Sequence, residues 1–261
     1  MMNLENIVAL SLLNGFPPHR ERQAMAEYLQ CLILQSVARH SVPGKMSFIG
    51  GTSLRFFYNL PRFSEDLDFD NFGLSVHDFE HIIAAVVADL SLQGFVVDSA
   101  VKIKGAYHCY IRFNNLLFEN RLSPHADEKI LVKIDTALQD FSVQTEKKFF
   151  NRYSIVEEVV VNPADILMAQ KTIALLERST PKGRDFFDFT FLDGFTKPSI
   201  AYLKHKIGLG GLLELKEAML KRCAQLDFDA LAKDAAPFIF NPNDIIRITK
   251  FRDYIAGWQV A

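Results

Sequence analysis

Hydrophobic residues at the start of the chain recur with the period of an α-helix. They are spaced three and four positions apart over residues 4–13 and again over residues 22–38, which is the pattern of helices that bury one face. Gly15, Pro17 and Pro18 lie between these two runs, and such residues interrupt regular structure. The sequence therefore predicts two N-terminal helices joined by a short loop.

A strand, a tight turn and a helix are predicted next. Residues 46–49 form a short apolar run, Gly50, Gly51 and Thr52 follow it, and residues 53–59 have helical spacing. Small residues before a helix let its N-terminal N–H groups approach phosphate, which the helix dipole favours. A turn with a purely structural role is the alternative interpretation.

An acidic strand is the most informative segment. Asp66, Asp68 and Asp70 alternate with Leu67 and Phe69, as in a strand with one acidic and one buried face. Because side chains two positions apart point to the same side, Asp66 and Asp68 can bind cations together. Enzymes that transfer phosphoryl or nucleotidyl groups hold Mg²⁺ or Mn²⁺ in this way. A strand that merely ends in an acidic turn is the alternative.

The rest of the pattern changes from mixed α and β to helical near residue 160. Residues 76–92 have helical spacing, and strand-like alternation follows over residues 95–103, 107–113, 130–136 and 154–161. Beyond that point the pattern predicts only helices, at about 163–178, 184–192, 198–207, 211–225 and 243–257. We expect an α+β protein with one domain over residues 1–161 and an all-helical lobe over residues 162–261.

Composition excludes several classes of protein. The chain of 261 residues is 49% hydrophobic, yet it contains no apolar run of about 18 residues and no N-terminal signal segment. We therefore expect a cytoplasmic protein with no membrane partner. Cys31, Cys109 and Cys223 are far apart and form no CxxC pair, which argues against zinc and disulfides. With 29 Lys and Arg against 31 Asp and Glu, net charge does not indicate a polyanionic partner.

Two motifs together resemble those of a known enzyme family. Gly50-Gly51-Thr52-Ser53-Leu54-Arg55 is followed by Arg62-Phe63-Ser64-Glu65-Asp66-Leu67-Asp68-Phe69. Both are similar to the signature of AbiEii/AbiGii-type toxins, which include MenT-like toxins, in the DNA polymerase β-like nucleotidyltransferase superfamily. The resemblance implies a polymerase β-like core with a mixed sheet, an NTP substrate and Mg²⁺ or Mn²⁺ as cofactor. It also implies that the substrate lies near Gly50, Gly51, Thr52, Arg62 and Ser64.

The resemblance implies a third carboxylate on a later strand, after a lysine. Lys133 and Asp135 provide this pair within an alternating segment, and alternation puts both on the same face. Asp135 would then complete the metal site, with Lys133 close to the substrate. A partly exposed pair on an amphipathic strand is the alternative. In some family members the equivalent of Ser64 is implicated in regulation by phosphorylation, which the spacing here would allow.

A helical lysine and an Arg-Asp-x-x-Asp element complete the family's pattern. Asp165 and Lys171 match the first, and Arg184, Asp185 and Asp188 match the second. We expect Lys171 to bind a nucleotide phosphate and Asp185 to position this lysine or the acceptor. Arg184 and Asp188 are expected near the substrate. The alternative is that the lysine lies on the solvated side of its helix and that the acidic residues are simply those favoured near a helix N-terminus.

The predicted reaction is attack of an acceptor hydroxyl on the α-phosphate of an NTP. The resemblance suggests the toxin of a toxin–antitoxin or phage-defence pair, with a cognate antitoxin and the tRNA 3′ end as acceptor. The most basic long stretch offers candidate contacts for RNA phosphates, namely Lys197, Lys204, Lys206, Lys216, Lys221 and Arg222. A small-molecule or protein acceptor, and a non-catalytic module that binds nucleotide or RNA, remain alternatives.

Overall fold

The computed structural model describes residues 2–259, which form two compact units. The first unit contains the chain up to Asn59 and resumes with Phe63–Val161. The second unit contains Leu60–Arg62 and the chain from Asn162 onward. Each unit has its own buried apolar core.

The short excursion of the chain into the second unit has a backbone cause. Arg62 forms an isolated antiparallel bridge with Ile239, and the N–H of Phe240 donates to the carbonyl of Pro61 over 3.1 Å. These contacts tie Pro61 and Arg62 to the C-terminal part of the chain. No sequence pattern indicates this pairing, because the partners are far apart along the chain.

A mixed seven-stranded sheet forms the centre of the first unit. Its strand order is β3-β4-β5-β2-β1-β7-β6. Neighbouring strands are antiparallel, except that β1 is parallel to β7 and β2 to β5. The strands are β1 Met46–Ile49, β2 Asp66–Asn71, β3 Val97–Lys104, β4 Ala106–Phe113, β5 Ile130–Leu138, β6 Glu146–Arg152 and β7 Ile155–Val161. The predicted α+β class is confirmed.

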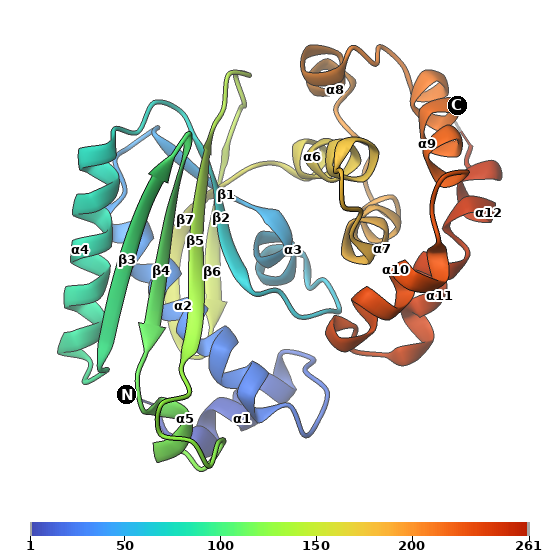
Figure 1. Ribbon diagram of the computed structural model, residues 1–261. Helices are drawn as coiled ribbons and strands as arrows, with labels where there is room; N and C mark the ends of the chain where they lie inside the picture. The colour runs from blue at the N-terminus through green and yellow to red at the C-terminus, as the bar shows by residue number, and fades with distance from the viewer. Residues whose placement is uncertain (1, 260–261) are drawn as a thin grey trace. The chain divides into compact units, whose positions relative to one another are not determined.

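One face of this sheet is apolar and is covered by two long helices. These are α2 (Glu21–His40) and α4 (Val76–Leu92), and α4 lies along the strands β3 and β4 (Figure 1). Ile111, Ile134 and Phe79 are among the side chains buried between helices and sheet. Removal of such apolar surface from water is the main force that stabilises the layer. Because side chains alternate along a strand, the polar residues between these positions lie on the opposite face.

The helix α3 (Gly50–Tyr58) follows β1 directly and packs against β2, β1 and β6. Its C-terminal end is fixed by buried charges. Arg152 donates to the carbonyl of Arg55 over 2.9 Å and to Asn59 Oδ1 over 2.7 Å, while Arg55 Nε donates to Glu27 Oε2 over 2.9 Å. Removing one partner of a buried ion pair is strongly destabilising, because the other charge is left buried without compensation. The first unit also contains the helices α1 Leu4–Leu13 and α5 Leu116–Glu119.

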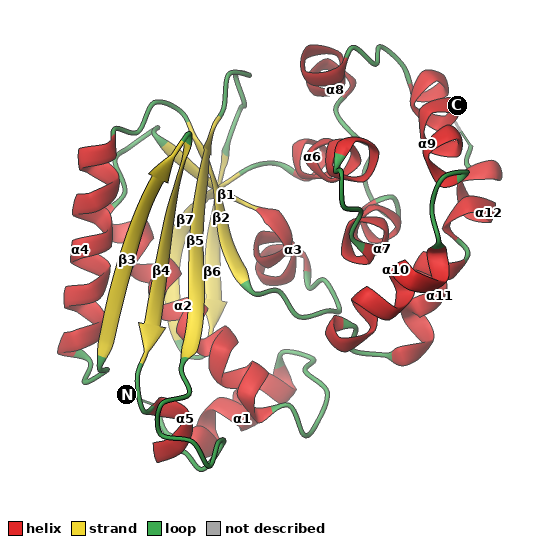
Figure 2. Cartoon of the chain, viewed as in Figure 1, coloured by secondary structure: helices red, strands yellow, loops and turns green. Residues whose placement is uncertain are grey.

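The described part of the second unit consists of helices joined by loops (Figure 2). Aromatic rings fill its core, where Phe186 meets Phe251 edge-on at 4.9 Å and Phe189 meets Trp258 at 5.8 Å between ring centroids. The helices are α6 Ala164–Glu177, α7 Gly183–Leu192, α8 Ile200–Ile207, α9 Leu212–Cys223, α10 Phe228–Ala235, η1 Ala236–Phe238, η2 Pro242–Ile245, α11 Ile246–Thr249 and α12 Phe251–Ala256.

Four elements were not predicted from the sequence, namely β6, α5, α10 and η1. The strand β6 begins with Glu146, Lys147 and Lys148, and these charged residues conceal its alternation. Such residues are tolerated because β6 is an edge strand. The helix predicted over residues 243–257 is divided into η2, α11 and α12. None of the described helices has an apolar stretch of the length needed to cross a bilayer.

Candidate active site

The turn between β1 and α3 brings a carboxylate against a helix N-terminus. Gly50 begins α3 with a φ of +78°, a conformation that favours glycine, and Gly51 follows it in the same turn. A Cβ on Gly50 would lie 2.2 Å from Asp68 Oδ2. The first N–H groups of a helix have no partner inside the helix, and the dipole is positive there. Gly50 therefore allows the acidic strand to approach an end of α3 that attracts anions.

Side chains from two helices hold the backbone that leads into β2. Thr52 Oγ1 donates to the carbonyl of Asp66 over 2.6 Å. Gln30, on α2, donates through Nε2 to the carbonyls of Ser64 and Glu65 over 2.9 and 2.7 Å. Three consecutive carbonyls are thus fixed just where the acidic strand begins. Thr52 is fully buried and its hydroxyl is occupied by this bond, so its side chain holds the acidic strand in place.

Strand register places the three predicted carboxylates on one face of the sheet. Asp68 is opposite Asp135 and Asp66 is opposite Lys133, on the parallel neighbours β2 and β5. Residues paired across strands point to the same face. On β4, His108 is the next partner of Asp135, and its Nδ1 lies 2.8 Å from Asp135 Oδ1. Charged and polar groups from three strands therefore meet on the polar face of the sheet, opposite the apolar face on which α2 and α4 pack.

Asp135 is held by two neighbours that contact different oxygens. Lys133 Nζ donates to Asp135 Oδ2 over 2.5 Å, while His108 contacts the other oxygen. Partial burial acts to lower the pKa of Lys133, but the carboxylates of Asp135 and Asp66 outweigh it and raise the pKa above its usual value. Lys133 therefore remains protonated and neutralises part of the acidic face.

The donor atoms on this face suit a hard divalent cation. Asp66 and Asp68 offer carboxylate oxygens, which Mg²⁺ and Mn²⁺ prefer. Because residue 50 is glycine, no Cβ crowds the Asp68 carboxylate. Among the described residues, no group of three or more His, Cys, Asp or Glu side chains converges as a complete metal cage. Mg²⁺ does not need one, because it is usually held by one or two carboxylates together with substrate phosphates and water. The acidic pair therefore fits a cation that shares its ligands with a nucleotide.

In the second unit, four of the predicted residues form a single buried ion network. Arg62 donates through Nε and Nη2 to the two oxygens of Asp188, each over 2.6 Å. Lys171 Nζ lies 2.8 Å from Asp188 Oδ2 and 3.4 Å from Asp185 Oδ1, and Arg178 lies 3.3 Å from the other oxygen of Asp185. Arg62 and Asp188 are almost fully buried. Their bidentate pair is the stronger and more directional kind of ion pair.

This network controls the ionisation of its members. Burial acts to raise the pKa of Asp188, but the charges of Arg62 and Lys171 outweigh it and hold that pKa below its usual value. Burial likewise acts to lower the pKa of Lys171, and Asp188 and Asp185 outweigh it, so that pKa lies above its usual value. Lys171 and Asp188 are therefore both charged at neutral pH.

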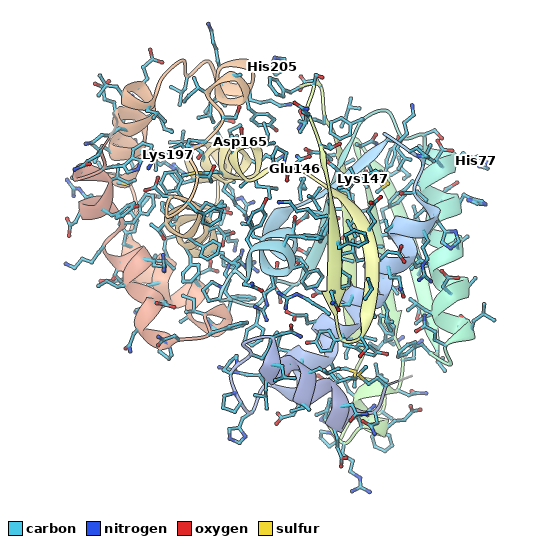
Figure 3. The ribbon with its side chains drawn as sticks, turned by 180° about the vertical axis from the view of Figure 1, so that it is seen from behind. His77, Glu146, Lys147, Asp165, Lys197 and His205 are labelled. Atoms are coloured by element: carbon cyan, nitrogen blue, oxygen red, sulfur yellow. The ribbon has the colours of Figure 1, made fainter. Side chains whose placement is uncertain are left out.

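The remaining motif residues of the second unit lie on α6 and α7. Asp165 is in the first turn of α6 (Figure 3). The guanidinium of Arg184 lies 4.1 Å from the centroid of the Phe238 ring, a cation–π contact that holds the side chain over an aromatic surface. The structure thus places Asp165 and Arg184 on the helices where the sequence predicted them.

Much of the predicted basic stretch has partners within its own unit. Lys197, labelled in Figure 3, pairs with Asp193 over 2.6 Å. Lys216 donates to the carbonyl of Trp258 over 2.8 Å, and Arg222 donates to carbonyls at the C-terminal end of α6. These three cations stabilise the fold of the second unit. The stretch as a whole is therefore a weaker candidate for binding RNA than its sequence suggests.

Two residues of the site were not singled out by the sequence. Gln30 lies in a stretch of α2 that is otherwise mostly apolar and buried, and a polar residue on the buried side of a helix is a usable signal. His108 gives no such signal, because only strand register brings it beside Asp135.

Comparison with known proteins agrees with this geometry. The family model of the nucleotidyl transferase AbiEii toxin, of type IV toxin–antitoxin systems, matches residues 32–241. That range is most of the chain and includes every motif residue that the sequence singled out. The chain belongs to the AbiEii family. The resemblance predicted from the sequence is thereby confirmed, and with it nucleotidyltransferase activity and a place among the proteins of toxin–antitoxin systems.

Solved structures show the same AbiEii-like fold at low sequence identity. MenT4, a nucleotidyltransferase toxin from Mycobacterium tuberculosis, is 15% identical with a TM-score of 0.60, covering 99% of this chain and 91% of its own. JHP933 from Helicobacter pylori is 18% identical with a TM-score of 0.55, covering 90% of this chain and 92% of its own. No curated protein sequence matches the chain. At these identities the structures support the fold alone.

We predict that Gly50→Ala is more damaging than Gly44→Ala in this AbiEii protein. Both glycines have a positive φ, but a Cβ on Gly44 has nothing within 4 Å. Each substitution should cost about 1–2 kcal/mol for the left-handed conformation, and Gly50→Ala should cost roughly 1–3 kcal/mol more for the clash with Asp68. Urea unfolding followed by circular dichroism measures the difference. Equal urea midpoints for the two variants would show that Asp68 does not need to lie this close to residue 50.

We also predict that Asp188→Asn strongly destabilises the second unit. Removing one partner of a buried ion pair costs about 3–5 kcal/mol, because Arg62 loses its bidentate carboxylate and Lys171 loses the nearer of its two. The fluorescence of Trp258, the only tryptophan, reports this unit's unfolding. Asp253→Asn is the control, since Asp253 is exposed and pairs with Lys250 at the surface.

The effect of Asp188→Asn should also depend on pH. Because the folded-state pKa of Asp188 is lowered, its stabilisation is complete above the unfolded-state pKa of about 3.9 and is lost as pH falls through the folded-state pKa. The stability difference between wild type and variant should therefore be constant near neutral pH and shrink below about pH 4. A difference that is small at pH 7 would contradict the assignment.

Proposed function

We propose that this protein transfers a nucleoside monophosphate from an NTP to a hydroxyl group of an RNA acceptor, with a divalent metal ion. The tRNA 3′ end is the acceptor we favour, and growth arrest by this modification would be the toxin's effect. The observation that carries the proposal is the placement of Asp66, Asp68 and Asp135 on one face of the sheet beside the N-terminus of α3. AbiEii family membership gives the general activity, and the site chemistry supports the finer details.

Asp66 and Asp68 would hold Mg²⁺ or Mn²⁺ together with the nucleotide's phosphates. The bound ion would neutralise the negative charge that develops on the phosphates and leaving pyrophosphate. The N–H groups of Gly50 and Gly51 lie at the N-terminus of α3, where a helix favours phosphate oxygens. Thr52 holds Asp66 through its hydroxyl, so the acidic strand and the phosphate-binding turn keep a fixed spacing.

Asp135 is in register with Asp68 and would act as the third ligand of the ion. Its carboxylate is already oriented by Lys133 and His108. Lys133 could donate to a phosphate oxygen in place of Asp135, and a lysine ammonium keeps its charge in either position. Two neighbouring side chains on one face of β5 would thus serve the metal and the nucleotide respectively.

Lys171 matches the family's helical lysine, and on that ground we propose that it binds a phosphate of the nucleotide. An ammonium group has three donors, and Asp188 and Asp185 account for two of them. The remaining donor suits a phosphate oxygen. In this proposal Asp185 positions Lys171, while Arg62 and Asp188 hold the network in place. Arg184 and Ser64 stay substrate-binding candidates on sequence grounds.

The expected partners and location follow from the family. A cognate antitoxin would restrain the toxin, since the family is described as part of a type IV toxin–antitoxin system. NTPs and tRNA are cytoplasmic, so we propose that the protein acts there. Co-expression with the neighbouring genes tests for the antitoxin, and cell fractionation tests the location.

Transfer can be tested with purified full-length protein, Mg²⁺, total RNA and each of the four NTPs labelled at the α-phosphate. The proposal expects label in a discrete RNA species, and no label from the same NTP labelled at the γ-phosphate. Label in protein or in a small molecule would replace the RNA acceptor by one of the alternatives. Absence of label with all four NTPs, and with tRNA supplied in excess, would contradict the proposal.

We predict that Asp66→Ala and Asp68→Ala each reduce transfer by at least about a thousandfold, because the metal's stabilisation is worth several kcal/mol. Asp135→Asn should lose less, since shape and some ligand capacity remain. The variants should keep the circular dichroism spectrum of the wild type. Asp127→Ala is the control, because Asp127 is an exposed acidic residue of the same unit. Normal turnover in either of the first two variants would remove them from the site.

A further inference from the structure

The polar face of the sheet, opposite the face on which α2 and α4 pack, continues from the acidic strand to the edge strand β3. One row of paired residues crosses four strands, from Asp68 through Asp135 and His108 to Lys102 on β3. Neighbouring strands are about 4.8 Å apart, so this row spans roughly 14 Å. It connects the metal-binding carboxylates to an exposed lysine on the edge strand. A ligand that reaches the carboxylates can therefore extend along the same face.

The next row of this face carries an aromatic ring. Tyr110 on β4 is flanked by Ala100 on β3 and by Lys133 on β5. Ala100 is small, so the residue directly opposite Tyr110 on the edge strand offers little bulk beside the ring. Lys102 Nζ and Lys133 Nζ lie 5.3 and 5.9 Å from the centroid of the ring. The half-buried Tyr110 is thus an aromatic surface between two cations.

The edge strand β3 contributes positive charge beside Tyr110. Lys102 and Lys104 are exposed, and among the residues that the structure describes neither has a carboxylate within ion-pair distance. The nearest acidic residue of the edge strand, Asp98, is paired with Arg112 over 2.8 Å and with Lys129 over 3.7 Å. The two lysines therefore remain available to a polyanion.

We propose that the face formed by Lys102, Lys104 and Tyr110 binds the single-stranded 3′ end of the RNA acceptor. This inference rests on the proposed function, because it supplies the acceptor for that reaction. An aromatic ring between cations is how proteins bind single strands without reading sequence, as the ring stacks on a base and the cations bind phosphates. A terminal hydroxyl near Asp68 and Asp135 would leave the preceding nucleotides over β4 and β3.

Two competing roles for these side chains are separable by experiment. Lysines on an edge strand can serve only to prevent pairing with another sheet, in which case RNA binding would not depend on them. Tyr110 could instead stack on the base of the NTP. In that case its loss would weaken NTP binding and leave RNA binding unchanged.

The test measures binding directly, so it does not require turnover. A short single-stranded RNA with a fluorescent 5′ end is titrated with full-length protein, and anisotropy is recorded at several salt concentrations. The variants are Tyr110→Ala, Tyr110→Phe and Lys102→Glu. Lys147→Glu is the matched control, because Lys147 is an exposed lysine on β6, the opposite edge of the same sheet (Figure 3). NTP binding is measured for each variant by calorimetry.

The proposal expects Tyr110→Ala to weaken RNA binding by about tenfold, as loss of one stacked base does, and Tyr110→Phe to bind like the wild type. Lys102→Glu should weaken binding and lower the logarithmic salt slope by roughly 0.7 per lost phosphate contact. RNA binding by Lys147→Glu, and the NTP affinity of every variant, should be unchanged. Equal RNA affinity in wild type, Tyr110→Ala and Lys102→Glu would overturn the proposal. Normal RNA binding without any transfer would instead count against the proposed function.

Discussion

The contact between Asp68 and the N-terminus of α3 is the constraint on which the site depends. Only glycine at position 50 leaves room for this carboxylate, and its positive φ lets β1 turn directly into the helix. The same turn then carries Thr52, whose hydroxyl holds the carbonyl of Asp66. Strand, turn and helix thus form one assembly in which the carboxylates and the first N–H groups of α3, a place that favours anions, keep a fixed distance.

Buried charges hold the surrounding parts of each unit. In the first unit, Glu27 pairs with Arg55 and Arg152 binds a carbonyl near the end of α3, so the C-terminal half of this helix is fixed. In the second unit, Arg62 and Asp188 form a bidentate pair to which Lys171 is added. Such pairs gain little net stability over apolar packing. Their advantage here is direction, since hydrogen-bonded ion pairs fix the orientation of both charged groups.

The sequence predicted those parts of the site that depend on local spacing. Alternation along β2 was enough to place Asp66 and Asp68 on one face, and the small residues before α3 indicated the turn. It could not reveal His108 beside Asp135, because that contact depends on register between β4 and β5. The pairing of Arg62 with Asp188 likewise joins residues 126 positions apart. The edge strand β6 was missed because its charged residues conceal the alternation on which strand prediction relies.

The central claim is that Asp66 and Asp68 hold a divalent ion together with the nucleotide. It is tested most directly by electron paramagnetic resonance of Mn²⁺ titrated into the full-length protein with each non-hydrolysable NTP analogue. The account predicts a bound Mn²⁺ signal that requires an analogue and is lost in both Asp66→Asn and Asp68→Asn, while both variants remain folded. Mn²⁺ binding of wild-type affinity in these variants would contradict it.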